Sequence, residues 1–137
     1  MDRRDLQELS KVRLKEAKAL LKGGMADGAY YLAGYAVECA FKACIAKETK
    51  RYEFPDKKRV DSSYKHDLDE LIKVAGLERV LVEQCRNIPE FRIKWEVVRS
   101  WSEQSRYQRH QLQQAEQLLA AISDSRNGVI PWIKVYW

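Results

Sequence analysis

The stretch from Gly28 to Lys47 constrains the fold of this chain more than any other part of the sequence. It contains no proline, and alanine recurs every three or four residues from just before it to its end, at Ala26, Ala29, Ala33, Ala36, Ala40, Ala43 and Ala46. Bulkier apolar side chains cover most of the other directions that a helix would present. A helix that is apolar nearly all round has to lie buried at the centre of a larger assembly. We therefore predict an all-α fold packed around one central helix.

One narrow polar strip interrupts this helix. Its four members share one face because they are spaced by four, three and four residues: Tyr31, Tyr35, Glu38 and Lys42. A glutamate four residues before a lysine forms a favourable ion pair on a helix, and burying either charge alone is costly. Two interpretations stay open: a salt bridge at the edge of the core, or a pair of charges that face a ligand-binding cleft.

The composition fits one domain without a membrane segment. A chain of 137 residues is long enough for one hydrophobic core but not for two. The longest uncharged run, Gly28 to Val37, is shorter than the roughly 20 residues that a membrane span requires. The amino-terminal residues Met1 to Leu6 lack an apolar signal region. We therefore expect a cytoplasmic protein with no membrane contact.

Cysteine usage and charge narrow the chemistry. Cys39, Cys44 and Cys85 are odd in number, lack CxxC spacing and lie inside helical patterns, which favours buried thiols in a reducing compartment. A net charge of +5 permits an anionic partner without requiring one. The chain contains no Gly-rich phosphate loop, HExxH motif or nucleophile elbow, so kinase, zinc protease and hydrolase functions are excluded. We predict neither a cofactor nor a metal.

Helical periodicity continues on both sides of the central stretch. Residues 3–22 carry a leucine-rich stripe that stops at the glycine pair 23–24, and so short a turn predicts a helical hairpin. A third helix is expected from a serine cap at residues 62–63, with the helix ending at Gly76. A fourth is expected over residues 78–88.

The remaining segments are less regular. Residues 48–63 are polar and basic, which predicts a long exposed loop. Residues 90–98 fit a strand or a helix, and we prefer a helix or an irregular segment because a lone strand would have no partner. The last long helix is expected to begin between residues 102 and 107 and to end near residues 127–128. The apolar tail 129–137 is expected to dock on its own domain or on a second subunit.

Two motifs connect the chain with a known family. The run from Gly34 to Ala43, GYAVECAFKA, resembles the second-helix signature of HEPN domains, small all-helical modules named for nucleotide binding in higher eukaryotes and prokaryotes. His66, which precedes a Leu-x-x-Leu pair, is similar to a position at the third helix of such domains. His66 has no cysteine or second histidine at ligand spacing, which favours a structural role over metal binding. The resemblance implies one domain over residues 1–137, an up-and-down bundle of about five helices.

The segment that begins at Arg99 carries the richest candidate chemistry. Trp101 followed by Arg106 and Tyr107 is similar to a Trp-x4-Arg-Tyr pattern found before the last helix of many HEPN proteins. If the segment is helical, Arg106 and His110 lie one above the other. An arginine fork beside a histidine suits a phosphate, because Arg holds two phosphate oxygens while His exchanges a proton near neutral pH.

HEPN ribonucleases carry a motif of Arg, four to six residues and then His on the last long helix, and two protomers bring these motifs together. The resemblance implies metal-free cleavage, in which His acts on the 2′-hydroxyl group and Arg stabilises the phosphorane. Here three residues separate Arg106 from His110, a departure that still keeps the side chains adjacent on a helix. An ion pair of Arg106 with Glu103 or Glu38 is the structural alternative.

Two functions and one structural role stay open. The first is a nucleotide- or RNA-binding module of a toxin–antitoxin or stress system, for which the resemblance implies a homodimer and a nucleotidyltransferase-family partner. Its ligand-binding residues would be Glu38, Lys42, Arg99, Arg106 and Tyr107. The alternative is a metal-independent RNA endonuclease with an atypical Arg-x3-His motif, whose catalytic residues would be Arg106 and His110. In the third interpretation these polar residues only maintain the fold.

Overall fold

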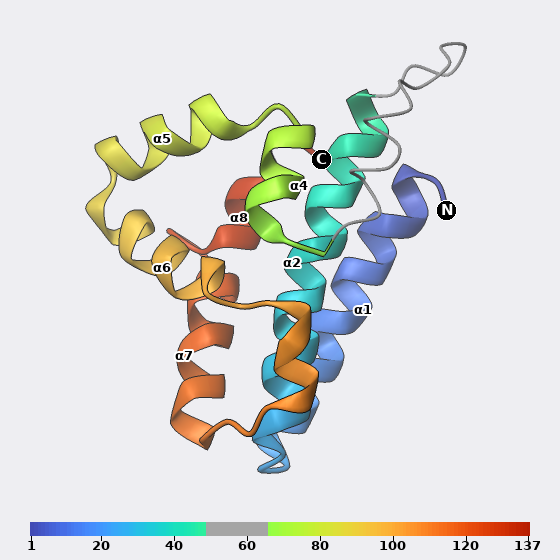
Figure 1. The fold of residues 1–137 in the computed structure, drawn as a ribbon, viewed down its shortest axis with the longest axis vertical. Helices are drawn as coiled ribbons and strands as arrows, with labels where there is room; N and C mark the ends of the chain where they lie inside the picture. Colours follow the sequence, from blue (N-terminus) through green and yellow to red (C-terminus); the bar gives the residue numbers. More distant parts are fainter. Residues whose placement is uncertain (49–65) are drawn as a thin grey trace.

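The computed structural model describes residues 1–48 and 66–137, and its regular elements are all helical (Figure 1). In chain order they are α1 (Arg3–Lys22), α2 (Ala26–Glu48), α4 (Leu68–Val74), α5 (Glu78–Asn87), α6 (Pro89–Arg99), the 3-10 helix η1 (Glu103–Tyr107), α7 (Leu112–Ser123) and α8 (Val129–Ile133). The predicted all-α bundle is confirmed. The described residues form more than the expected five helices because segments 89–99 and 129–133 are short helices of their own. The predicted serine cap and most of the predicted basic loop lie outside the described residues.

α1 and α2 form the predicted helical hairpin (Figure 1). α1 begins with a capping box, in which the Asp2 carboxylate accepts from the Asp5 N–H at 2.8 Å and the Asp5 carboxylate accepts from the Asp2 N–H at 3.0 Å. α1 ends before Gly23, and Gly24 has a φ of 77°, in the left-handed region that favours glycine. Because only residues 23–25 separate the two helices, α2 runs back along α1.

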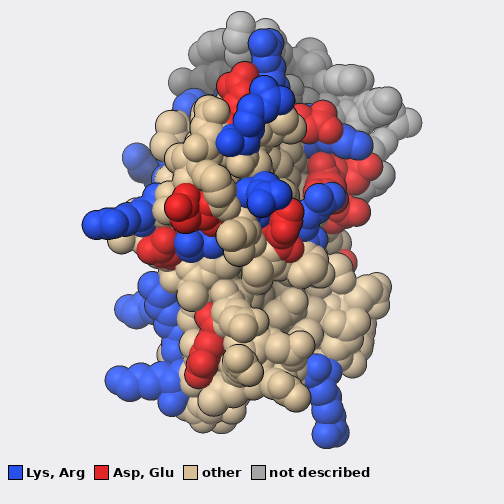
Figure 2. Space-filling model, turned by 90° about the vertical axis from the view of Figure 1, so that its left-hand side faces the viewer, with Lys and Arg blue, Asp and Glu red and all other residues tan. Residues whose placement is uncertain are grey.

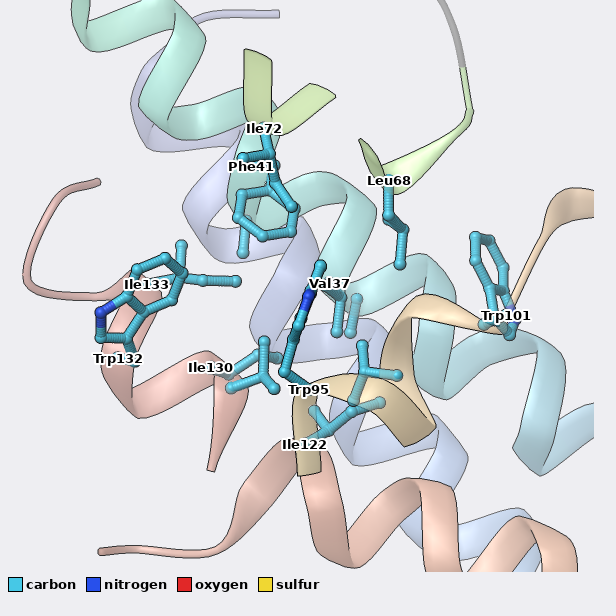
Figure 3. Close-up of a cluster of buried hydrophobic side chains, with 14 of the residues drawn as sticks. Val37, Phe41, Leu68, Ile72, Trp95, Trp101, Ile122, Ile130, Trp132 and Ile133 are labelled. Carbon is cyan, nitrogen blue, oxygen red and sulfur yellow. The ribbon is translucent and has the colours of Figure 1, made fainter. Parts of the chain in front are cut away.

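α2 lies at the centre of the bundle, as its apolar surface predicts. It contacts α1, α4, η1, α7 and α8. Ala36 and Ala40 are fully buried, and the Ala36 carbonyl oxygen accepts a hydrogen bond from the Ser10 hydroxyl of α1 at 2.7 Å. Elsewhere on α2, Phe41 packs edge-on against Trp95 of α6, with ring centroids 6.2 Å apart (Figure 3). None of the described helices is long and apolar enough to cross a membrane.

The apolar tail docks on its own domain, one of the two predicted outcomes. Ile133 of α8 is fully buried and Trp132 is 8% exposed (Figure 3). The Trp132 ring packs against Phe91 of α6, with centroids 5.3 Å apart. The carbonyl oxygen of Trp137 accepts a hydrogen bond from the Arg3 guanidinium at 2.7 Å, so the two ends of the chain are joined.

Two predicted helix boundaries were wrong. The helix that contains the Leu-x-x-Leu pair begins at Leu68, capped by the Asp67 carboxylate, which accepts from the Asp69 N–H at 2.9 Å. His66 therefore precedes that helix, whereas a helix that began at residues 62–63 would have His66 in its first turn. The predicted last helix is broken: η1 ends at Tyr107, residues 108–111 are not helical, and α7 covers only Leu112–Ser123. Gln111 is the N-cap of α7, and its N–H donates to the Gln114 side chain at 2.9 Å. Glutamine is not among the usual N-cap residues, so the sequence offered little indication that a helix begins here.

Candidate functional site

A glycine on α2 fixes the position of η1. A Cβ at Gly34 would lie 2.2 Å from the Trp101 ring, so the indole occupies the space that any side chain at position 34 would need. Trp101 is 2% exposed, and Ser105 within η1 is also buried. η1 packs on α2 directly after this contact. The packing brings Arg106 and Tyr107, at the end of η1, beside the polar strip of the central helix.

Glu38 is the buried centre of that strip. Its side chain is 1% exposed and has two partners within residues 1–48 and 66–137: Lys42 Nζ lies 3.3 Å from Oε2, and His66 Nδ1 lies 2.9 Å from Oε1. A buried carboxylate is tolerated only when it is paired and hydrogen-bonded. With Nδ1 as the donor to Glu38, the other ring nitrogen of His66 faces Glu103 of η1, 3.5 Å away. His66 thereby connects α2 to η1.

Arg106 lies at the exposed end of this connected group. Its guanidinium donates a hydrogen bond to the Tyr107 hydroxyl at 2.6 Å and lies 4.7 Å from the centre of the Tyr107 ring. This hydrogen bond raises the pKa of Arg106 above its ordinary value, with a smaller contribution from Tyr31 of α2. Glu103 is at 4.0 Å, the outer limit of an ion pair. A chain of contacts therefore runs from Arg106 to Glu103, then to His66 and Glu38. Glu38 in turn pairs with Lys42.

His110 does not join this group. Its imidazole stacks on Tyr30, with ring centroids 3.8 Å apart, and its backbone N–H donates to the Asp27 carboxylate. Tyr30 and Tyr31 are consecutive on α2, so their side chains point about 100° apart. The expectation that Arg106 and His110 stack on one helical face was wrong, because residues 108–111 are not helical. His110 instead lines a shallow hollow of about 390 Å³ beside residues 24–28.

Arg99 also lies apart from Arg106. It ends α6 and pairs with Asp69 of α4 at 3.2 Å. Both residues line a groove of about 450 Å³ between α4, α5 and α6. Figure 2 shows side chains of both charge signs over the part of the surface where α5 and α6 lie. Arg99 therefore belongs to a surface of mixed charge and not to the surface around Arg106.

A sequence profile described as the HEPN domain matches residues 4–127, which run from α1 to the turn between α7 and α8. The chain belongs to the HEPN family. The predicted resemblance is thus confirmed over nearly the whole chain, and HEPN membership suggests a function related to nucleotides or RNA. Neither curated proteins nor solved structures gave a significant match to the chain.

Two contacts of the polar group in this HEPN domain were not predicted: that of His66 with Glu38 and that of Glu103 with His66. His66 was expected to be structural, but its contact with Glu38 was not predicted, and Glu103 was considered only as a partner of Arg106. One signal was available: a carboxylate in the middle of a buried helix needs more than one donor, and Lys42 supplies only part of that need. The identity of the second donor depends on a contact between residues 28 positions apart in the chain.

Proposed function

We propose that this HEPN domain binds RNA or a nucleotide at the Arg106 surface, defined as Arg106, Tyr107, Lys42 and His66. The observation that carries the proposal is the exposed pair of Arg106 and Tyr107. The guanidinium has five donors in a planar fork, and the Tyr107 hydroxyl occupies one position of this fork. Glu103 is too distant for a strong hydrogen bond. Tyr31 of α2 contributes a further contact, and the donors that remain on the exposed guanidinium can bind phosphate oxygens.

Tyr107 supplies the second half of such a site. Its side chain is 73% exposed at the end of η1, where most of a large aromatic residue meets water. An exposed aromatic ring next to an arginine offers a stacking surface for a base and a cation for its phosphate. Stacking on an aromatic ring contributes about 1–3 kcal/mol per base in single-stranded nucleic-acid binding.

Glu38 acts in this proposal as a positioning residue. Its carboxylate is buried, so we assign it no direct contact with a ligand, unlike the ligand-binding role expected from the sequence. It holds Lys42 and His66, whose side chains are 19% and 38% exposed. His66 also lies 3.5 Å from Glu103 of η1. Arg99 has no place in the Arg106 surface, because it pairs with Asp69 in a different groove.

The proposal is binding and not cleavage. An endonuclease of the Arg–His type needs both side chains at one phosphate, whereas Arg106 and His110 have separate partners on α2. Cleavage of RNA in EDTA that is abolished in His110→Ala would establish the endonuclease alternative in place of simple binding.

We further propose that the domain forms a homodimer and acts in a toxin–antitoxin or stress system with a nucleotidyltransferase-family protein. Family membership supports the system and the partner. For the dimer, α7 adds an observation: its outward side chains are nearly all uncharged, and Glu116 is the one charged residue in the helix. Figure 2 shows a largely uncharged area in the lower part of the surface, where α7 lies. The cores of protein interfaces are depleted of charged residues.

The test of the Arg106 surface uses a ligand too short to reach other parts of the molecule. Binding of a labelled RNA trinucleotide is measured by fluorescence anisotropy for the wild type, Arg106→Ala and Arg109→Ala. Arg109 is the matched control, because it is an exposed arginine of the same segment. We expect Arg106→Ala to weaken binding at least about tenfold and Arg109→Ala to change it little. Unchanged binding together with a lowered melting temperature in Arg106→Ala would contradict the proposal.

A further inference from the structure

The outer face of α1 carries a row of positive charges that the Arg106 surface does not use. We name it the α1 stripe; its members, all exposed, are Arg4, Lys11, Lys15, Lys18 and Lys22. At about 100° per residue, the five side chains lie within about 60° of the helix circumference. The opposite face of α1 contains the buried residues Ser10 and Ala17, so the stripe points away from α2.

Most of the stripe does not contribute to the stability of the helix; Lys22 is the exception, because a cation in the last turn is favourable. Lys11 and Lys15, like Lys18 and Lys22, are four residues apart, and like charges at this spacing destabilise a helix. Glu8 pairs with Lys11 at 3.1 Å, but both side chains are more than half exposed, and such pairs contribute little. Within the described residues, Lys15, Lys18 and Lys22 form no ion pair. The stability of the fold therefore does not explain why five cations lie together here with one acidic residue among them.

We infer that the α1 stripe is a second contact for the RNA backbone, used by strands longer than those that the Arg106 surface binds. This inference rests on the proposed RNA binding. The four lysines span about 16.5 Å at a rise of about 1.5 Å per residue. A stacked strand carries one phosphate per about 3.4 Å, so this length of α1 meets about five phosphates. The spacing supplies a phosphate for every lysine.

The residues around the stripe favour RNA over a membrane surface. A helix that lies in a membrane interface inserts large apolar side chains beside its lysines. On α1 the leucines face inward: Leu14 and Leu21 pack against the hydrophobic core of the domain. Among the outward positions, Val12 is the one exposed large hydrophobic residue of α1. An anionic strand needs only the charges that the stripe presents.

The test compares two variants of equal net charge. The stripe variant changes Lys11, Lys15, Lys18 and Lys22 to Gln. The control variant changes four exposed cations of other elements to Gln: Lys73, Arg79, Arg86 and Arg126. Each variant loses four positive charges, which lowers the formal net charge from +5 to +1. Any effect of overall charge is therefore the same in both, and melting curves confirm that both are folded.

The readout is the salt dependence of binding to a labelled oligouridylate of about 20 nucleotides. The slope of log K, the binding constant, against log salt concentration falls in magnitude by about 0.7 for each phosphate of a single strand that the protein no longer neutralises. The stripe variant lacks four lysines, so the magnitude of its slope should fall by about 2–3. We expect its affinity to fall at least about tenfold at moderate salt, and the control variant to fall much less. Equal reductions of slope and affinity in the two variants would overturn the inference.

The outcomes separate the stripe from the Arg106 surface. If the trinucleotide binds through Arg106 but the stripe variant behaves like the control with the long strand, the stripe inference fails alone. If the long strand needs the stripe but the wild type does not bind the trinucleotide, the Arg106 proposal fails and the stripe stands. Stripe-dependent binding to phosphatidylserine vesicles, without binding to the long strand, would replace RNA with a membrane as the partner.

Discussion

Trp101 packs directly on the backbone of Gly34: the indole ring occupies the space where the Cβ of any other residue at position 34 would lie. Glycine inside a helix costs about 1 kcal/mol relative to alanine, so its presence in the central helix requires a compensating gain. That gain is the close packing of Trp101, which is 2% exposed, and of η1 after it. The same contact places Arg106 near the polar strip.

Replacing Gly34 with alanine should therefore disturb both stability and binding. The added methyl group would lie 2.2 Å from a rigid ring, so we expect the free energy of unfolding to fall by about 1–3 kcal/mol. Gly28→Ala is the control, because its Cβ would meet only a flexible end of Leu20, at 3.1 Å. Urea unfolding of the two variants checks this. Equal stability of the two variants would show that the packing of Trp101 does not require a glycine at position 34.

Removing the buried carboxylate of Glu38 should lower the free energy of unfolding more than removing the more exposed carboxylate of Glu103. Glu38→Ala leaves Lys42 and His66 without their acceptor, and we expect a loss of about 2–4 kcal/mol, near the lower end for a broken buried pair because both partners reach water. Glu103→Ala, at a residue 33% exposed, should cost less than about 1 kcal/mol. Urea unfolding measures both. A Glu38 variant as stable as the wild type would mean that the ion pairs only offset their own desolvation.

The three cysteines should differ in reactivity. Burial raises the pKa of Cys39 to about 11 and that of Cys44 to about 12. At pH 8 about one Cys39 thiol in a thousand is then ionised, and the thiolate is the reactive form. Titration with a disulfide reagent should detect at most one thiol in the native protein, the half-buried Cys85, and all three in urea. Rapid reaction of two thiols in the native protein would contradict the burial of this core.

The proposed dimer predicts an effect of charge on α7. Light scattering should give about twice 16.1 kDa for the wild type. Lysines in place of Gln113 and Gln117 would bring positive charges together at the interface, so we expect the mass to fall to that of the monomer. Val82→Lys with Asn87→Lys on α5 adds the same charge at other exposed positions and should leave the dimer intact. A wild-type monomer would contradict the dimer itself.

The sequence predicted the parts of the fold that depend on local periodicity. The hairpin of α1 and α2 followed from a leucine stripe, a glycine pair and an alanine repeat, all of which act over short distances along the chain. The rejection of a strand for residues 90–98 was also confirmed: of the two alternatives left, helix or irregular segment, the structure has the helix, with Pro89 at the first turn of α6. These signals do not require knowledge of which elements meet in space.

The parts that were missed depend on contacts between distant residues. The polar segment after Trp101 reads as the start of one long helix, and its division into η1 and α7 follows from the packing of Trp101 on Gly34, 67 positions earlier in the chain. The same holds for His66, whose partner Glu38 lies on another helix. His110 was misplaced for this reason: the side chain that holds it, Tyr30, belongs to the central helix.

The central claim is that the ligand binds at the Arg106 surface, and backbone amide chemical shifts measured during titration with an RNA trinucleotide test it most directly. We predict that the largest shifts occur at residues 103–107 and at Lys42 and His66, with small shifts at residues 24–30. The two regions adjoin different faces of α2, so their signals report separate sites. Shifts confined to residues 24–30 and His110, or no shifts at millimolar trinucleotide, would contradict the claim.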